Sequence, residues 1–216
     1  MDPLHFAIAV IPVALYLFFA GLINLLPRAS VVSGYVDTWG LALGLVGLVV
    51  AGPMELFMPE ATAFRFGPIV WILLLALYLL CITLIVLTMR PRIVVYNIPR
   101  EQLWQILQQV AGELDPQVRF AGNAVSLPNL GVDAHLDDFV AMRNIQLVAN
   151  SQRQDPRGWA MFEKAIRSAL RGTKTGPSPN GFGLITFALV FAVAVGLALV
   201  RHPQEIAQSL HEMLRF

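Results

Sequence analysis

The side chains best suited to bind a metal ion are Asp133, His135 and Asp137, in the segment LGVDAHLD at residues 130–137. Their spacing of two places all three on one face of a β-strand, and carboxylates with imidazole can ligate divalent metals. The same spacing spreads them over about 13 Å, so one ion would need a further ligand from elsewhere. The solvent-exposed face of an antiparallel sheet is also polar, which explains the same alternation without a metal. We therefore favour an exposed strand face and expect no metal or other cofactor.

A second group of polar residues lies within or beside long apolar runs, and its members are Asn24, Asp37 and Glu55. Ionisable groups inside a membrane usually serve a function. Glu55, which two prolines flank, is the strongest candidate for a transport path. The alternative places it in the headgroup region, hydrated or paired with Arg65, where a carboxylate costs much less than at the bilayer centre. We favour this alternative.

Four basic residues lie on one broad face of a predicted helix, and they are Arg157, Lys164, Arg167 and Arg171. Next to a membrane, each could contribute ~1 kcal/mol to binding anionic lipid. An ordinary solvated helix face, diluted by Glu163, explains them equally well. The sequence leaves both interpretations open.

Small residues form stripes on two apolar segments. Gly40, Gly44 and Gly47 recur at spacings of four and three, and Ala192 and Gly196 form a similar pair. Such residues let helix backbones approach closely. The stripes fit either packing within the chain or self-association, and we favour packing within the chain.

Other chemistries have no sequence support. The chain contains no GxxxxGK[ST], HExxH or GxSxG motif. Cys81 is the only cysteine, which excludes an intrachain disulfide and a cysteine-rich metal site. The net charge of +1 gives no basic excess for a nucleic-acid partner. We expect no catalytic residues and, on balance, no enzymatic activity.

The elements that carry these residues fall into two classes. Of the 216 residues, 56% are hydrophobic and 13% are charged, whereas about 25% are charged in a typical soluble domain. Runs near the ~20 residues that span a bilayer predict transmembrane helices at about 7–26, 39–58, 68–89 and 182–200. The first run should be a retained helix rather than a cleaved signal, because the start, MDPLH, lacks Lys and Arg.

Residues 91–175 have the patterns of a small α+β domain. The predicted order is β-α-β-β-β-α, with both helices on one face of the sheet in two layers. We expect this domain to fold without the membrane. Residues 176–216 should form a linker, the fourth transmembrane helix and a short amphipathic C-terminal helix at the interface.

The fold class is therefore an α-helical integral membrane protein with an inserted α+β domain. Lys and Arg near the span ends place this domain in the cytoplasm and both termini outside, in an inner or plasma membrane of bacterial type. The expected function is that of a non-enzymatic multi-pass component, whose domain binds a partner protein, a second copy or the membrane surface, as part of a larger assembly. The alternatives are a transporter or channel subunit with a polar path near Glu55 and Asn24, and a membrane enzyme of unknown chemistry.

Overall fold

The computed structural model describes residues 3–54, 69–139, 144–151, 154–173, 175–176, 179–201, 203–205 and 207. The chain divides into two compact units. The helical unit comprises Met1–Phe19, Trp39–Leu87 and Leu184–Phe216. The sheet unit comprises Ala20–Thr38 and Thr88–Gly183, so it includes the segment between the first two apolar helices.

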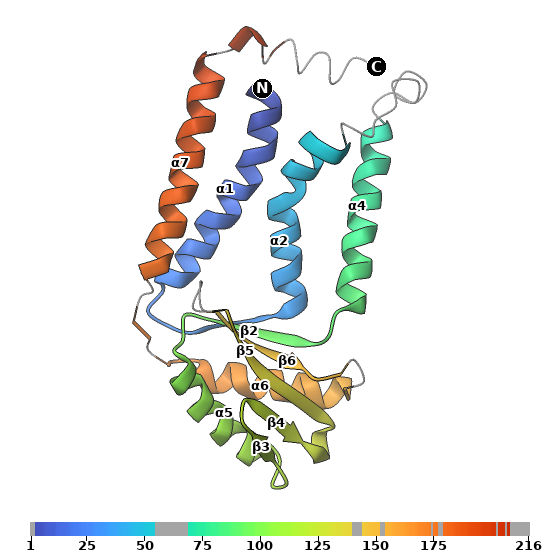
Figure 1. Cartoon of the computed structure of the whole chain (residues 1–216), viewed down its shortest axis with the longest axis vertical. Coiled ribbons are helices and arrows are strands. Elements are labelled where there is room, and N and C mark those ends of the chain that lie inside the picture. The colour runs from blue at the N-terminus through green and yellow to red at the C-terminus, as the bar shows by residue number, and fades with distance from the viewer. Residues whose placement is uncertain are drawn as a thin grey trace. The chain divides into compact units, whose positions relative to one another are not determined.

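Among the described residues, four helices are long and apolar enough to cross a membrane, and Figure 1 labels them. They are α1 (Pro3–Leu25), α2 (Gly34–Val49, continued by the π-helix Val50–Met54), α4 (Ile69–Thr88) and α7 (Pro179–Arg201). Their candidate spans of 20 to 23 residues are about 30–34 Å long, close to the ~30 Å of a hydrocarbon core. The predicted number of apolar helices is confirmed.

The boundaries of the second helix differ from the prediction. α2 begins at Gly34, five residues before the predicted start at 39, and its polar first turn contains Asp37. A carboxylate is favourable there because the first turn carries unpaired backbone N–H groups. Glu55 and the rest of the predicted span lie outside the described residues, as do Ile206, Leu210 and the other apolar residues of the predicted C-terminal helix.

The glycine stripe of α2 packs against α1 within the helical unit. A Cβ on Gly44 would lie 2.8 Å from Cβ of Tyr16, and one on Gly47 would lie 1.9 Å from the carbonyl oxygen of Ile8. Pro12 has no N–H to donate to that carbonyl, so the two helices meet where the first has lost a backbone hydrogen bond. This contact confirms the interpretation of the stripe as packing within the chain.

The pair in α7 differs from the stripe in α2. Ala192 and Gly196 line an apolar groove of about 360 Å³ between α1 and α7. A Cβ on Gly196 would meet nothing within 4 Å. The groove leaves space beside these small residues, whereas the stripe in α2 is filled.

The described part of the sheet unit contains an antiparallel sheet of six strands in the order β1-β2-β6-β5-β4-β3. The strands are β1 (Ser30–Ser33), β2 (Arg92–Tyr96), β3 (Arg119–Ala121), β4 (Ala124–Leu127), β5 (Val132–Phe139) and β6 (Asn144–Ala149). A short 3-10 helix, Pro128–Leu130, joins β4 to β5.

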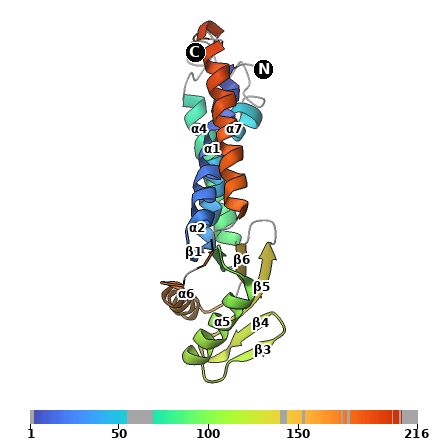
Figure 2. The ribbon, with the colours of Figure 1, turned by 90° about the vertical axis from the view of Figure 1, so that its left-hand side faces the viewer.

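The observed order of elements corrects the predicted β-α-β-β-β-α. Within the predicted domain it is β-α-β-β-β-β-α, because β3 and β4, the two arms of the hairpin around Gly122, are separate strands. β1 adds a sixth strand from outside the predicted range of 91–175. The helices are α5 (Arg100–Leu114) and α6 (Pro156–Leu170). They cover one face of the sheet, as predicted (Figure 2).

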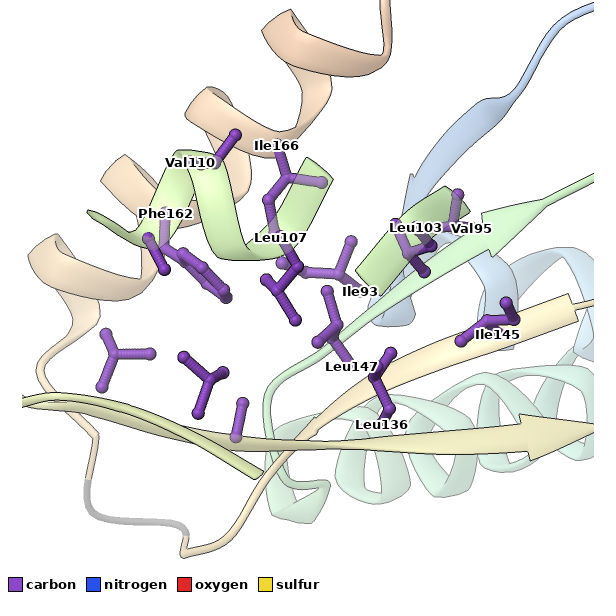
Figure 3. Packing of buried hydrophobic residues seen from close by; sticks show 14 of the residues in the cluster. Ile93, Val95, Leu103, Leu107, Val110, Leu136, Ile145, Leu147, Phe162 and Ile166 are labelled. Atoms are coloured by element: carbon purple, nitrogen blue, oxygen red, sulfur yellow. The ribbon is translucent and has the colours of Figure 1, made fainter. Parts of the chain in front are cut away.

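The core of the sheet unit lies between this face and the two helices. Side chains from α5 and α6 point toward those of the strands (Figure 3), and the labelled residues include Leu103, Leu107, Phe162 and Leu147. These four side chains are completely buried, and each contributes about 1.5–3 kcal/mol of hydrophobic stabilisation. The buried residues of α5 recur at helical spacing, as Leu103 and Leu107 show, and form part of the helix side of the core.

Two carboxylates fix the ends of the domain helices. Asp155 caps α6 by accepting hydrogen bonds from the N–H groups of Arg157 and Gly158 at 3.2 and 3.1 Å. Asp115 follows α5 and accepts from the N–H groups of Gln117 and Asn129, both at 2.8 Å. Burial raises the pKa of the Asp115 carboxyl, but these and further hydrogen bonds outweigh it and hold the pKa below its ordinary value.

Candidate functional site

The connection between α1 and α2 is part of the sheet. In β1, Ser30 lies opposite Tyr96 and Ser33 lies opposite Ile93, so this short strand forms one edge beside β2. The last residues of α1, the whole of β1 and the first turn of α2 belong to the same compact unit as the domain. The domain is thus joined to the ends of apolar helices by strand pairing as well as by the chain itself.

A polar network around Arg92 holds the first turn of α2 to the sheet. The guanidinium of Arg92 forms an ion pair with Asp37, with Nη2 and Oδ2 3.1 Å apart. It also donates to the hydroxyl of Thr38 at 3.1 Å and to the side-chain oxygen of Gln146 at 3.2 Å. The hydroxyl of Tyr96 donates to the other oxygen of Asp37. Asp37 is therefore engaged with the domain and serves as an anchor.

The first residue of α2, Gly34, must be small. A Cβ on Gly34 would lie 2.1 Å from Cγ of Arg92, so any larger residue would displace the arginine from its partners. This requirement depends on a residue 58 positions further along the chain (92 − 34), and the local sequence around Gly34 does not reveal it.

Two further polar contacts tie the same connection to the domain. Ser33 donates a hydrogen bond of 2.5 Å to Glu163 of α6, and Glu163 also accepts from Arg167 at 2.7 Å. Asn97 donates to the backbone carbonyl of Leu26, and the N–H of Thr175 donates to the carbonyl of Pro27 at 3.3 Å. Contacts from both sides of the domain thus hold the segment in place.

Asn24 has a local role in the structure. The residue is buried near the end of α1, and its amide nitrogen donates to the carbonyl oxygen of Ala20 at 2.9 Å. Its side-chain oxygen has no hydrogen-bond partner among the described residues. Because Glu55 lies outside the described residues, the suggested polar path between the two stays a prediction.

Three arginines meet at a hollow of about 230 Å³ in the sheet unit, which we call the arginine pocket. It is lined by Arg28, Arg167 and Arg171, together with Ala29, Ser30, Val31, Leu170 and Gly172. Arg167 pairs with Glu163. In the part of the chain that the structure describes, neither Arg28 nor Arg171 has a hydrogen-bond or ion-pair partner for its guanidinium.

The pocket divides the basic helix face predicted from the sequence. Arg167 and Arg171 line it, whereas Arg157 and Lys164 are exposed on the same helix without lining it. Sequence reasoning did not assign Arg28 to this group, because only the pairing of β1 with β2 brings it beside α6. The sequence signal that could have pointed to Arg28 was its position directly after the first apolar run.

The three residues considered for metal binding share one face of β5, as the alternation predicts. Asp133 and Asp137 are exposed and His135 is half-buried. Nδ1 of His135 lies 2.6 Å from the side-chain oxygen of Asn150, so this ring nitrogen already has a partner. Among the described residues, no group of three His, Cys, Asp or Glu side chains is arranged to hold a metal ion.

The comparisons with known proteins add no function to this geometry. No protein-family model, no curated protein and no solved structure matches the chain.

Proposed function

We propose that this protein is a non-enzymatic multi-pass membrane component, and that its α+β domain faces the cytoplasm and mediates contact with a partner protein or the membrane surface. The pairing of β1 with β2 carries the proposal. The chain that joins α1 to α2 forms an edge strand of the domain, so the domain is tied to both of these membrane-length helices and can present a surface at the bilayer.

The four apolar helices support the part of the proposal that concerns the membrane. Large apolar side chains are exposed along all of them, including Leu87 at 76% and Val200 at 79%. A soluble protein rarely exposes contiguous apolar surface on this scale. The hydrocarbon core of a bilayer can surround such helices, so that no further layer of protein is needed to cover their apolar side chains.

The distribution of basic residues supports the cytoplasmic orientation. In the sequence, Arg28 follows α1, Arg90 and Arg92 follow α4, and Arg171 precedes α7. The opposite side has Arg201 at the end of α7, together with Arg65 and the more distant Arg215 by their positions in the sequence. An excess of Lys and Arg in short loops marks the cytoplasmic side.

Cysteine labelling in intact cells tests this orientation. In a Cys81→Ala background, Lys164→Cys places a thiol on an exposed position of α6, and Gln204→Cys places one beyond α7. A membrane-impermeant maleimide should label the thiol at 204 in intact cells, and the thiol at 164 only after permeabilisation. The reverse pattern would refute the cytoplasmic orientation.

Site-specific photo-crosslinking tests the interaction role. A photoreactive amino acid at Lys164 samples the helix face, and one at Asp133 samples the exposed sheet face. Discrete adducts of protein or lipid at one face, and few at the other, would support an interaction surface. Absence of discrete adducts at both faces in intact cells would contradict the proposed role.

A further inference from the structure

We propose that the arginine pocket binds the phosphate group of an anionic membrane lipid. The proposal rests on the proposed function only in requiring that the helices be inserted in a bilayer. It assigns a ligand chemistry to one defined hollow in the sheet unit and thereby separates two of the four basic residues of α6 from the others.

The arginine pocket has an excess of positive charge, which a bound anion would neutralise. Three arginines line a volume of about 230 Å³, and one carboxylate, that of Glu163, pairs with the guanidinium of Arg167. Arg28 and Arg171 have no anionic partner among the described residues. Guanidinium groups bind phosphate with two parallel hydrogen bonds, and the adjacent Ser30 hydroxyl can donate another.

Side chains must provide this binding, because the backbone opposes it. The pocket lies at the end of α6, after Leu170. The C-terminal end of a helix carries a partial negative charge that disfavours an anion. Removing positive side-chain charge should therefore weaken binding strongly, with no compensation from backbone N–H groups.

The place of the pocket in the chain favours a lipid as the source of the phosphate. Arg28 lies three residues after Leu25, the last residue of α1, and this end of the helix belongs to the same unit as the pocket. The headgroup layer extends about 5–8 Å beyond each side of the hydrocarbon core. A residue within one turn of the end of a span can reach a lipid phosphate in this layer.

The apolar part of the lining also favours a lipid over free phosphate. Ala29 and Val31, which are partly exposed, lie beside the arginines. The carbon atoms next to a phosphodiester can contact these side chains and lose hydrated apolar surface. Inorganic phosphate has no carbon atoms and gains nothing from them.

The test measures lipid binding to the full-length protein in mild detergent by native mass spectrometry. The probe is phosphatidylglycerol, with phosphatidylcholine and inorganic phosphate as the comparison ligands. Arg28→Gln and Arg171→Gln should each reduce the affinity for phosphatidylglycerol about fivefold, and the double variant about 25-fold. Arg157→Gln and Lys164→Gln remove the same charge from exposed positions outside the pocket, and should leave the affinity nearly unchanged.

Three results would overturn the proposal. The first is an equal loss of affinity in the control variants, which would indicate a diffuse basic surface. The second is equal binding of phosphatidylcholine. The third is displacement of the lipid by inorganic phosphate at equal concentration, which would assign the pocket to a soluble anion. Arg28→Lys keeps the charge but loses the paired hydrogen bonds, so it should lose less affinity than Arg28→Gln, and it guards against loss through misfolding.

A failure of lipid binding by the arginine pocket can be distinguished from a failure of the proposed function. Binding in detergent does not depend on which side of the membrane the domain faces. A reversed labelling pattern in cells with intact pocket-dependent binding would overturn only the orientation. The expected labelling pattern without such binding would overturn only the pocket.

Discussion

The ion pair between Asp37 and Arg92 makes the most direct test of how the domain is joined to the helices. Asp37→Asn keeps the shape of the side chain and the oxygen that accepts from Tyr96. It places an amide NH₂ where Oδ2 accepted from Arg92. The change therefore removes one charge and one charged hydrogen bond from the network.

The size of the effect follows from the exposure of the two side chains. The side chains of Arg92 and Asp37 are 23% and 17% exposed. Their interaction should therefore be stronger than that of a fully exposed ion pair and comparable to a partly buried hydrogen bond between charged groups. Exposed ion pairs contribute about 0–1 kcal/mol, and hydrogen bonds to charged groups contribute about 1.5–3 kcal/mol. We expect a loss of about 2 kcal/mol, which corresponds to a factor of about 30 in the opening equilibrium.

Hydrogen exchange of the full-length protein in detergent or nanodiscs measures this loss where it occurs. Amide protection in β1 and the first turn of α2 should fall about 30-fold in Asp37→Asn, and protection in β4 and β5 should change little. Asp133→Asn is the matched control, since Asp133 is exposed on β5 and its carboxylate has no partner among the described residues.

Two outcomes would refute this reasoning. Protection of β1 that stays within about threefold of wild type would show that the ion pair does not hold the strand. An equal loss in Asp133→Asn would show that any reduction of negative charge has the same effect. A double-mutant cycle with Arg92→Gln should yield a coupling of about 1–3 kcal/mol for residues in one network.

Three further changes have expected outcomes. Gly47→Ala should destabilise the α1–α2 contact by about 1–3 kcal/mol, measured as a lower melting temperature in detergent, whereas Gly196→Ala, facing open space, should change it little. Asp115→Asn should lower stability at neutral pH and flatten the acid side of the stability profile. Because the folded pKa of Asp115 is lowered, its contribution is present above the unfolded pKa of about 3.9 and is lost as the pH falls through the folded pKa. The fragment 91–175 should melt at a lower temperature by circular dichroism than a fragment that also carries residues 26–38 on a short flexible linker. Equal melting would mean that β1 adds no stability.

The apolar helices and the domain core were predictable because their signals are local. Each span is a continuous apolar run, and each domain helix repeats its apolar residues at helical spacing, as Leu103 and Leu107 show. The cap at Asp155 and the start of α6 at Pro156 also follow from adjacent residues. These features need no knowledge of distant partners.

β1 and the arginine pocket were not predictable because their signals are non-local. SVVS is only four residues long and contains two apolar side chains, and its strand conformation depends on pairing with β2 about 60 positions later. The same pairing brings Arg28 beside α6. Asp37 could be singled out as a polar residue next to a span, but its partner Arg92 follows a different span.

The separation of β1 from β2 also has a consequence for synthesis of the chain. From Ser33 to Arg92 the ribosome must add 59 residues (92 − 33), including α2 and α4. At about 5–20 residues per second this takes about 3–12 s, during which β1 has no partner strand. In the membrane topology that we propose, a nascent chain that misinserts either helix would leave β1 and β2 on opposite sides of the bilayer. The unpaired edge of β2 would then be prone to aggregation or proteolysis. Chains in which the sheet closes, which are the correctly inserted ones, would be spared this loss.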